Sequence, residues 1–96
     1  MEKRLGIIAV IVEESTSVPR INSLFSEYAG LIDARLGLPM HGKGISLISL
    51  VVEGDTDEIG ALTGKLGKLA GVKVKSVLTA YKEGEDGEQR GTPDIH

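Results

Sequence analysis

Three glycines at helical spacing are the residues of this sequence whose pattern most suggests a binding surface. Gly60, Gly64 and Gly67 share one stripe of a helix, at about 100° per residue, well away from the leucines of the same segment. Each glycine inside a helix costs about 0.5–1 kcal/mol relative to alanine, so three together need a reason. Close approach of a partner helix or a ligand is one reason. Tight packing within the domain, or tolerance of glycine on a helix held by its leucines, are the others.

Thr63, Gly64 and Lys65 resemble part of a phosphate-binding loop. The full pattern has two glycines that bracket four positions ahead of Lys and Ser or Thr, and that spacing is absent here. Lys65 and Lys68 are better interpreted as the solvated face of an amphipathic helix. We keep Thr63 and Lys65, like the glycines, as candidate ligand contacts, although the phosphate-loop pattern is absent.

Metal-binding side chains are sparse. The chain has no cysteine and two histidines, His41 in a glycine-rich turn and His96 as the last residue. A transition-metal site needs several converging ligands, and the lack of cysteine also removes disulfides and thiolate chemistry. We expect no metal and no cofactor, and we interpret His41 as a turn residue.

No arrangement of side chains indicates catalysis. Serines are frequent, but no Ser, His and Asp positions together support a nucleophilic triad. We expect no catalytic residue, and a protein that is not an enzyme.

The strands that must position these residues follow from hydrophobic periodicity. Residues 5–12 and 45–52 are apolar on both alternating faces, as in central strands. Residues 31–38 and 72–79 carry charged side chains among the apolar ones, which is typical of edge strands.

Two helices separate these strands. The first follows the capping candidates Ser15, Thr16 and Ser17 and stops at Gly30. The second starts at a capping box of Asp55 and Glu58, with Asp in place of the usual Ser or Thr. The order βαββαβ predicts an α+β fold, a ferredoxin-like two-layer sandwich with antiparallel sheet order 4132, because the first and third strands of that fold are central.

Charge divides the chain into a neutral domain and an acidic tail. Residues 82–96 hold two basic and five acidic side chains, whereas residues 1–81 hold nine of each. We predict one domain over residues 1–81 and a disordered acidic C-terminal tail over residues 82–96.

The neutral domain has no cluster of basic side chains of the kind that binds nucleic acid, and its central strands have no aromatic residue on which bases could stack. We therefore expect no direct nucleic-acid binding.

Membrane association is not expected either. The longest apolar run, residues 7–12, is far shorter than the roughly 20 residues that span a bilayer. No signal-peptide pattern follows the basic residues near the start. A cytoplasmic protein is the simplest interpretation.

The central strands are apolar on both faces, yet two helices cover only one face of a four-stranded sheet. Soluble monomers seldom expose such a patch. We expect another copy of the chain to bury it, in a dimer or tetramer formed through the open sheet face or the sheet edges, or a partner protein.

Residues 1–77 closely resemble the small family of regulators of the iron-only hydrogenase system. The resemblance is strongest over residues 55–77 and extends to Arg35, Gly37 and Pro39. It implies a ferredoxin-like fold similar to ACT domains, which sense small molecules at interfaces between copies, and to the ligand-sensing half of nickel-responsive repressors. The chain departs from those repressors, since it lacks their DNA-binding segment and their His and Cys ligands.

The resemblance implies a non-enzymatic regulatory module, an ACT-like oligomer that binds a small effector or a partner protein. The alternative is a structural interaction protein or assembly factor without a small-molecule ligand. If an effector binds, its expected contacts lie at the start of the first helix, in the segment from Arg35 to His41, and along the glycine stripe. They are Thr16, Ser17, Arg35, Gly37, His41, Gly60, Thr63, Gly64 and Lys65.

Overall fold

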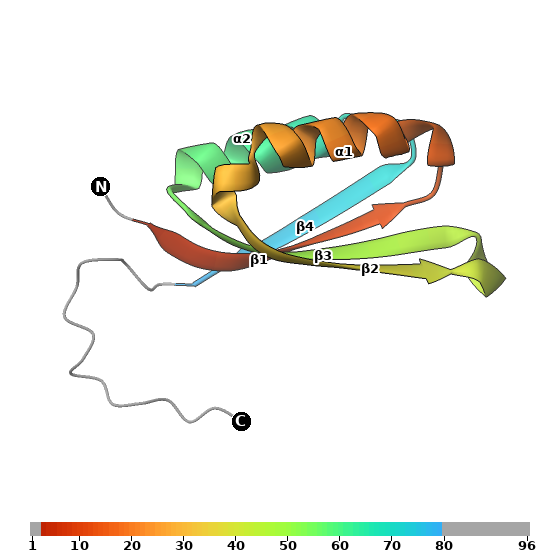
Figure 1. Cartoon of the computed structure of the whole chain (residues 1–96), viewed down its shortest axis with the longest axis horizontal. Coiled ribbons are helices and arrows are strands. Elements are labelled where there is room, and N and C mark those ends of the chain that lie inside the picture. Colours follow the sequence, from red (N-terminus) through yellow and green to blue (C-terminus); the bar gives the residue numbers. More distant parts are fainter. Residues whose placement is uncertain (1–2, 80–96) are drawn as a thin grey trace, which may run out of the picture.

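Two helices cover one face of a four-stranded antiparallel sheet in the computed structural model, which describes residues 3–79 (Figure 1). The predicted order βαββαβ and the α+β sandwich are thereby confirmed. The acidic tail predicted over residues 82–96 lies outside the described residues. In chain order the elements are β1 (Arg4–Val12), α1 (Val18–Glu27), β2 (Ile32–Met40), β3 (Ile45–Gly54), α2 (Thr56–Gly67) and β4 (Val72–Leu78).

The strands lie in the order β2-β3-β1-β4, so the apolar strands are central and the charged strands form the two edges, as predicted. The edges differ in regularity. A register shift between Ile32 and Ala34 interrupts β2, and Pro39 removes a backbone donor from it. The pairing of β4 with β1 runs without a shift from Val72 to Leu78. The outer side of β4 is therefore the more regular edge.

The start of α2 agrees with the capping box read from the sequence. The Glu58 N–H donates to Asp55 Oδ1 at 2.7 Å, and the Asp55 N–H donates to Glu58 Oε1 at 3.4 Å. These bonds satisfy backbone donors that a helix start leaves without an intrahelical partner.

The start of α1 differs from the prediction. Residues Ser15–Ser17 form a 3₁₀ turn, and Ser17 makes no capping hydrogen bond with its side chain. The backbone of Ser17 is already helical (φ −85°, ψ −9°), whereas a capping serine needs an extended backbone. Its buried hydroxyl instead donates to the carbonyl oxygen of Ala70 at 2.7 Å. Ser17 thus ties the start of α1 to the turn before β4.

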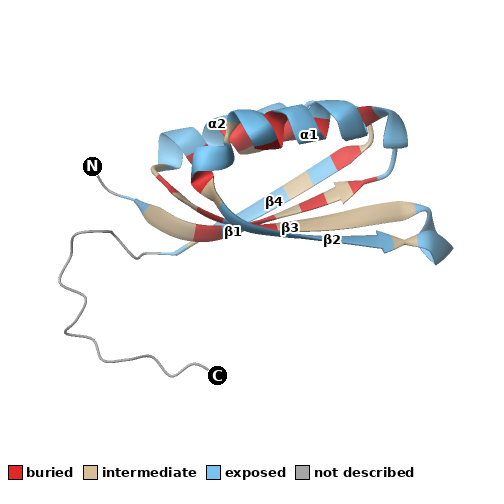
Figure 2. Ribbon diagram, viewed as in Figure 1, coloured by how far each residue is buried: buried red, intermediate tan, exposed pale blue. Residues whose placement is uncertain are grey.

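The hydrophobic core lies between the helices and the sheet, where buried positions alternate along the central strands (Figure 2). In β1 the alternation places Ile8 and Val10 under the helices, while Ile7 points to the other face. The fully buried large side chains are Ile8, Val10, Ile21, Leu24, Leu50, Val52, Ile59, Leu62 and Leu66. Aliphatic side chains fill most of the core of residues 3–79, with Phe25 buried among them and Tyr28 packed against them.

Candidate functional site

The open face of the sheet is the first candidate surface. Ile7 lies opposite Val51 on one neighbouring strand and opposite Val77 on the other, so all three share the face without helices. Leu36 and Leu38 of β2 continue this face. They are the five most exposed large hydrophobic side chains of residues 3–79, apart from Val18 on α1: Ile7 49%, Leu36 69%, Leu38 51%, Val51 39% and Val77 69%. The uncovered apolar face that the pattern predicted is present in the single chain.

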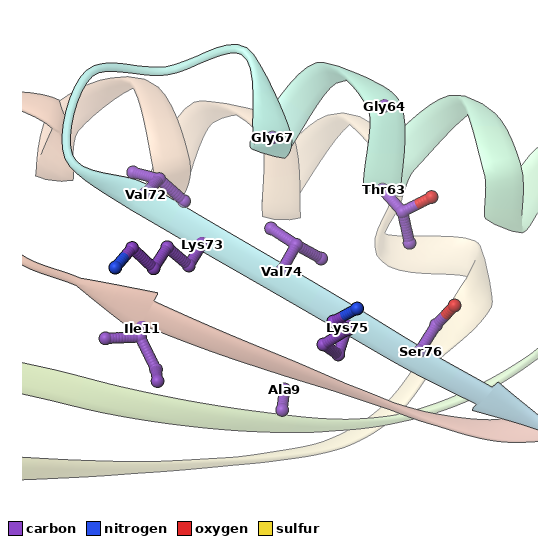
Figure 3. A pocket seen from close by; sticks show the side chains of 10 residues that line it. All are labelled: Ala9, Ile11, Thr63, Gly64, Gly67, Val72, Lys73, Val74, Lys75 and Ser76. Atoms are coloured by element: carbon purple, nitrogen blue, oxygen red, sulfur yellow. The ribbon is translucent and has the colours of Figure 1, made fainter.

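A hollow follows the outer edge of β4 (Figure 3). It has a volume of about 810 Å³ and extends around the strand from the helix layer to the open face of the sheet. Val74 and Ser76 lie on the helix side, because they pair with Val10 and Ile8, whereas Lys73 and Lys75 lie on the open side. We name this hollow the β4-edge groove; it is lined by Ala9, Ile11, Thr63, Gly64, Gly67 and residues 72–76.

The glycine stripe of α2 faces open space. A Cβ atom built at Gly60, Gly64 or Gly67 would meet no heavy atom within 4 Å outside the helix backbone nearby. Tight packing within the domain, one of the interpretations drawn from the sequence, is therefore wrong for these glycines. Gly64 and Gly67 line the β4-edge groove, and Gly60 does not. The stripe leaves room beside β4 where longer side chains of α2 would project.

Replacing Gly64 with Ala is expected to raise the free energy of unfolding by about 0.5–1 kcal/mol, because the methyl group meets open space and alanine favours the helix. Urea unfolding at fixed protein concentration measures the change. The matched control is Ala61→Gly, an exposed position of the same helix, which should lose a similar amount. A loss of stability in Gly64→Ala would contradict the open surroundings of this glycine.

Lys65 points to the other helix and does not line the β4-edge groove. Its Nζ lies 5.0 Å from the centre of the Tyr28 ring and donates to Glu27 Oε2 at 3.3 Å. The hydrogen bonds with Tyr28 and then with Glu27 raise the pKa of Lys65 above its ordinary value. Because the ion pair with Glu27 is exposed, it adds little stability.

Arg35 lies at the opposite edge of the sheet. Its guanidinium carbon is 4.8 Å from the centre of the Phe25 ring, a cation–π contact between β2 and α1. Arg35 and Phe25 line a second hollow of about 330 Å³. Gly37 is exposed on the same strand, and a Cβ built there would also meet open space.

The remaining candidate residues lie near the start of α1 and the β2–β3 turn. His41 is exposed and lines a third hollow, of about 240 Å³, together with Ser15 and Val18. Thr16 is exposed in the 3₁₀ turn, and neither Thr16 nor Ser17 lines this hollow.

The nine candidate contacts therefore do not converge on one site. Thr63 and Gly64 meet at the β4-edge groove, whereas Arg35 lies three strands away. At about 4.8 Å per strand the two places are roughly 14 Å apart across the sheet. One small ligand cannot contact both within one chain.

Sequence reasoning missed four residues that line the β4-edge groove: Lys73, Val74, Lys75 and Ser76. The alternation of Val and Lys in residues 72–75 predicts an edge strand and does not by itself indicate a site. The signal that could have pointed to them is the combination of a regular edge with a neighbouring helix that carries small residues. Sequence alone does not tell that the glycine stripe faces this edge.

The described residues contain no obvious metal centre or membrane span. Within residues 3–79, no group of three or more His, Cys, Asp or Glu side chains is placed to hold a metal ion. No helix there is long and apolar enough to cross a membrane.

Comparison with known proteins places this geometry among related chains. The family model described as "TM1266-like: Iron-only hydrogenase system regulator, putative" matches residues 4–76. The solved structure of the uncharacterized protein TM1266 from Thermotoga maritima is 37% identical, with a TM-score of 0.77 over 80% of this chain and 98% of that one. An ACT domain protein from Streptococcus pneumoniae is 20% identical, with a TM-score of 0.53 over 78% of this chain and 89% of that one. The second similarity shows the ACT-like fold alone. A search of curated proteins found no match.

Proposed function

We propose that this chain, which belongs to the TM1266-like family, is a non-enzymatic regulatory module of the iron-only hydrogenase system that assembles through its open sheet face and binds an effector. The observation that carries the assembly is the uncovered apolar face. Leu36 and Val77, both 69% exposed, stand at its two sides, with Ile7 and Val51 between them. Burial of such a patch between copies removes apolar area from water, at about 25 cal/mol per Å².

The proposed assembly also bears on the effector, because a second copy could complete a binding site that one chain leaves incomplete. The two hollows that hold Thr63 and Arg35 lie at opposite sheet edges of the part of the chain that the structure describes, so the candidate contacts of one chain are divided between them. The proposed effector site is formed by one of these groups, either Thr63 and Gly64 or Arg35 and Gly37. A second copy would supply the rest of its enclosure.

A structural interaction protein without an effector is the second candidate. It is favoured by the polar side chains of residues 3–79, where no buried nitrogen or oxygen atom lacks a hydrogen-bond partner. A preformed ligand site often contains such an atom, which waits for the ligand. The surface then serves for assembly with a protein, and the hollows carry no ligand.

Two measurements test the proposal. Multi-angle light scattering at micromolar concentration should give a mass that is a multiple of 10.2 kDa, and a stable monomer would contradict assembly through the open face. A thermal-shift screen of amino acids, nucleotides and metal ions should give a rise with one class of compound. A ligand at 100 times its Kd stabilises by about 2.7 kcal/mol, which such a screen detects. No shift with any compound would favour the structural alternative.

A further inference from the structure

The outer edge of β4 has backbone groups directed away from the sheet. At the two ends of the β1–β4 ladder, Glu13 N–H donates to Gly71 O at 2.6 Å and Thr79 N–H donates to Leu5 O at 2.8 Å. In an antiparallel ladder, residues two apart direct their backbone groups to the same side. The even-numbered residues between these ends, including Val74 and Ser76, therefore direct N–H and C=O outward. No strand of residues 3–79 pairs with that side.

The lysines of β4 determine which strand this edge accepts. Lys73 and Lys75 lie on the open face beside Ile11 and Ala9, which are uncharged. Lys73 Nζ lies 3.4 Å from Glu13 Oε2, and no contact of Lys75 with an acidic group of residues 3–79 is found. Like charges directly opposite each other on paired strands are destabilising, and opposite charges stabilise. Lysines on an edge thus oppose pairing with neutral or basic strands and favour an acidic one.

The same charges oppose pairing of β4 with the β4 of a second copy. An antiparallel pair centred on Val74 would place Lys73 of each chain opposite Lys75 of the other. A pair centred on Lys75 would place the two Lys75 side chains opposite each other. Both of these extended registers therefore bring lysines together. An acidic strand from a different protein meets no such repulsion.

The β4-edge groove provides room for the other side of such a strand. Side chains that alternate away from the lysines would point to the helix layer, beside Val74 and Ser76 (Figure 3). Gly64 and Gly67 of α2 leave that space open, since a Cβ at either position meets nothing within 4 Å. The groove thus fits apolar side chains at every second residue.

We infer that the outer edge of β4 binds an extended segment of a partner protein in which acidic and apolar residues alternate. The segment adds a fifth strand to the sheet, with main-chain hydrogen bonds to Val74 and Ser76. Its acidic side chains lie beside Lys73 and Lys75, and its apolar side chains fill the groove below Gly64 and Gly67. The regular edge of β4 accepts this strand, and β2, with its register shift and Pro39, does not. The inference rests neither on assembly nor on a small effector.

The test uses the full chain and a capped peptide of alternating Glu and Val residues, with a peptide of alternating Lys and Val residues as its control. Amide NMR spectra recorded during titration should show saturable binding of the Glu/Val peptide, with shifts centred on Val74 and Ser76. Hydrogen exchange of these two amides should slow at least tenfold on binding. The Lys/Val peptide should not bind.

Two variants test separately the charge of Lys75 and the open space of the groove beside Gly64. Lys75→Glu should weaken binding of the Glu/Val peptide roughly three- to tenfold and allow the Lys/Val peptide to bind. Lys43→Glu, with the same change of charge in the β2–β3 turn, should leave binding unchanged. Gly64→Leu should weaken binding of the Glu/Val peptide by filling the groove, while the amide spectrum of the sheet is retained.

Several results would overturn the inference. These are no saturable binding of the Glu/Val peptide, shifts centred on β2 or the open face, or equal effects of Lys75→Glu and Lys43→Glu. Slow exchange of the Val74 and Ser76 amides without peptide would also overturn it. If that protection rises with protein concentration, a second copy occupies the edge; if it does not, the chain's own residues do.

Discussion

Replacing Leu36 and Leu38 together with Glu is expected to convert the proposed assembly into single folded chains. Both side chains are more than half exposed in the single chain, at 69% and 51%, and stand on the open face of the edge strand β2. Full burial of a leucine contributes about 1.5–3 kcal/mol, and a buried carboxylate without a partner costs far more. The double variant removes the stabilisation by the two leucines and adds the cost of two buried carboxylates in every copy. Light scattering should therefore give one chain mass.

The fold itself should survive this change, because neither leucine belongs to the core between sheet and helices. Far-ultraviolet circular dichroism should match that of the unchanged protein. The control is Asn22→Glu with Ser23→Glu, which adds the same two charges to exposed positions of α1. It should stay assembled. An assembly of unchanged mass in the Leu36 and Leu38 variant would mean that copies meet through the helices or the sheet edges.

The strand order and the uncovered face could be predicted because both depend on alternation along a strand. Residues 5–12 and 45–52 are apolar at odd and even positions alike, and this pattern requires a central place in the sheet. The bonds of α2's capping box span three residues, so the pattern is also visible in the sequence. Strand alternation and the capping box depend on residues close together in the sequence, and the packing of the domain is consistent with both.

The role of Ser17 could not be predicted, because its hydrogen bond crosses 53 residues to Ala70. A serine before a helix is most often a cap, and the 3₁₀ turn of Ser15–Ser17 prevents that role.

The β4-edge groove could not be predicted either, because it also depends on the packing of one element against another. It joins Gly64 of one helix to Lys75 of the following strand, and their proximity depends on how α2 lies on the sheet. The candidate contacts chosen from the sequence thus include one wall of the groove and miss the other.

Gly71 lies in the turn between these two walls, and its replacement with Ala is expected to lower the free energy of unfolding by about 2–5 kcal/mol. Its φ is +70°, in the left-handed region, where a side chain costs about 1–2 kcal/mol. A Cβ there would also lie 2.5 Å from Glu14 Cγ and 2.9 Å from the Glu14 backbone nitrogen. Overpacking of this kind costs about 1–3 kcal/mol.

The turn has little freedom to relieve this clash. The Gly71 carbonyl oxygen accepts the Glu13 N–H at 2.6 Å, and the neighbouring Ala70 carbonyl oxygen accepts the Ser17 hydroxyl at 2.7 Å. A shift that separates the new methyl group from Glu14 would lengthen both bonds. Because the same turn sets the position of β4 relative to α2, the shift would also change the width of the β4-edge groove.

Gly44→Ala is the matched control, because Gly44 has the same φ of +70° and a Cβ there meets nothing within 4 Å. It should lose only the backbone contribution, about 1–2 kcal/mol. Urea unfolding of both variants at one protein concentration measures the difference, which isolates the contact with Glu14. Equal losses would mean that Glu14 and the 3₁₀ turn move aside without cost, so that the turn does not hold β4 in place. A larger loss in Gly71→Ala would show that the contact with Glu14 resists displacement, so that the turn before β4 is held firmly against the start of α1.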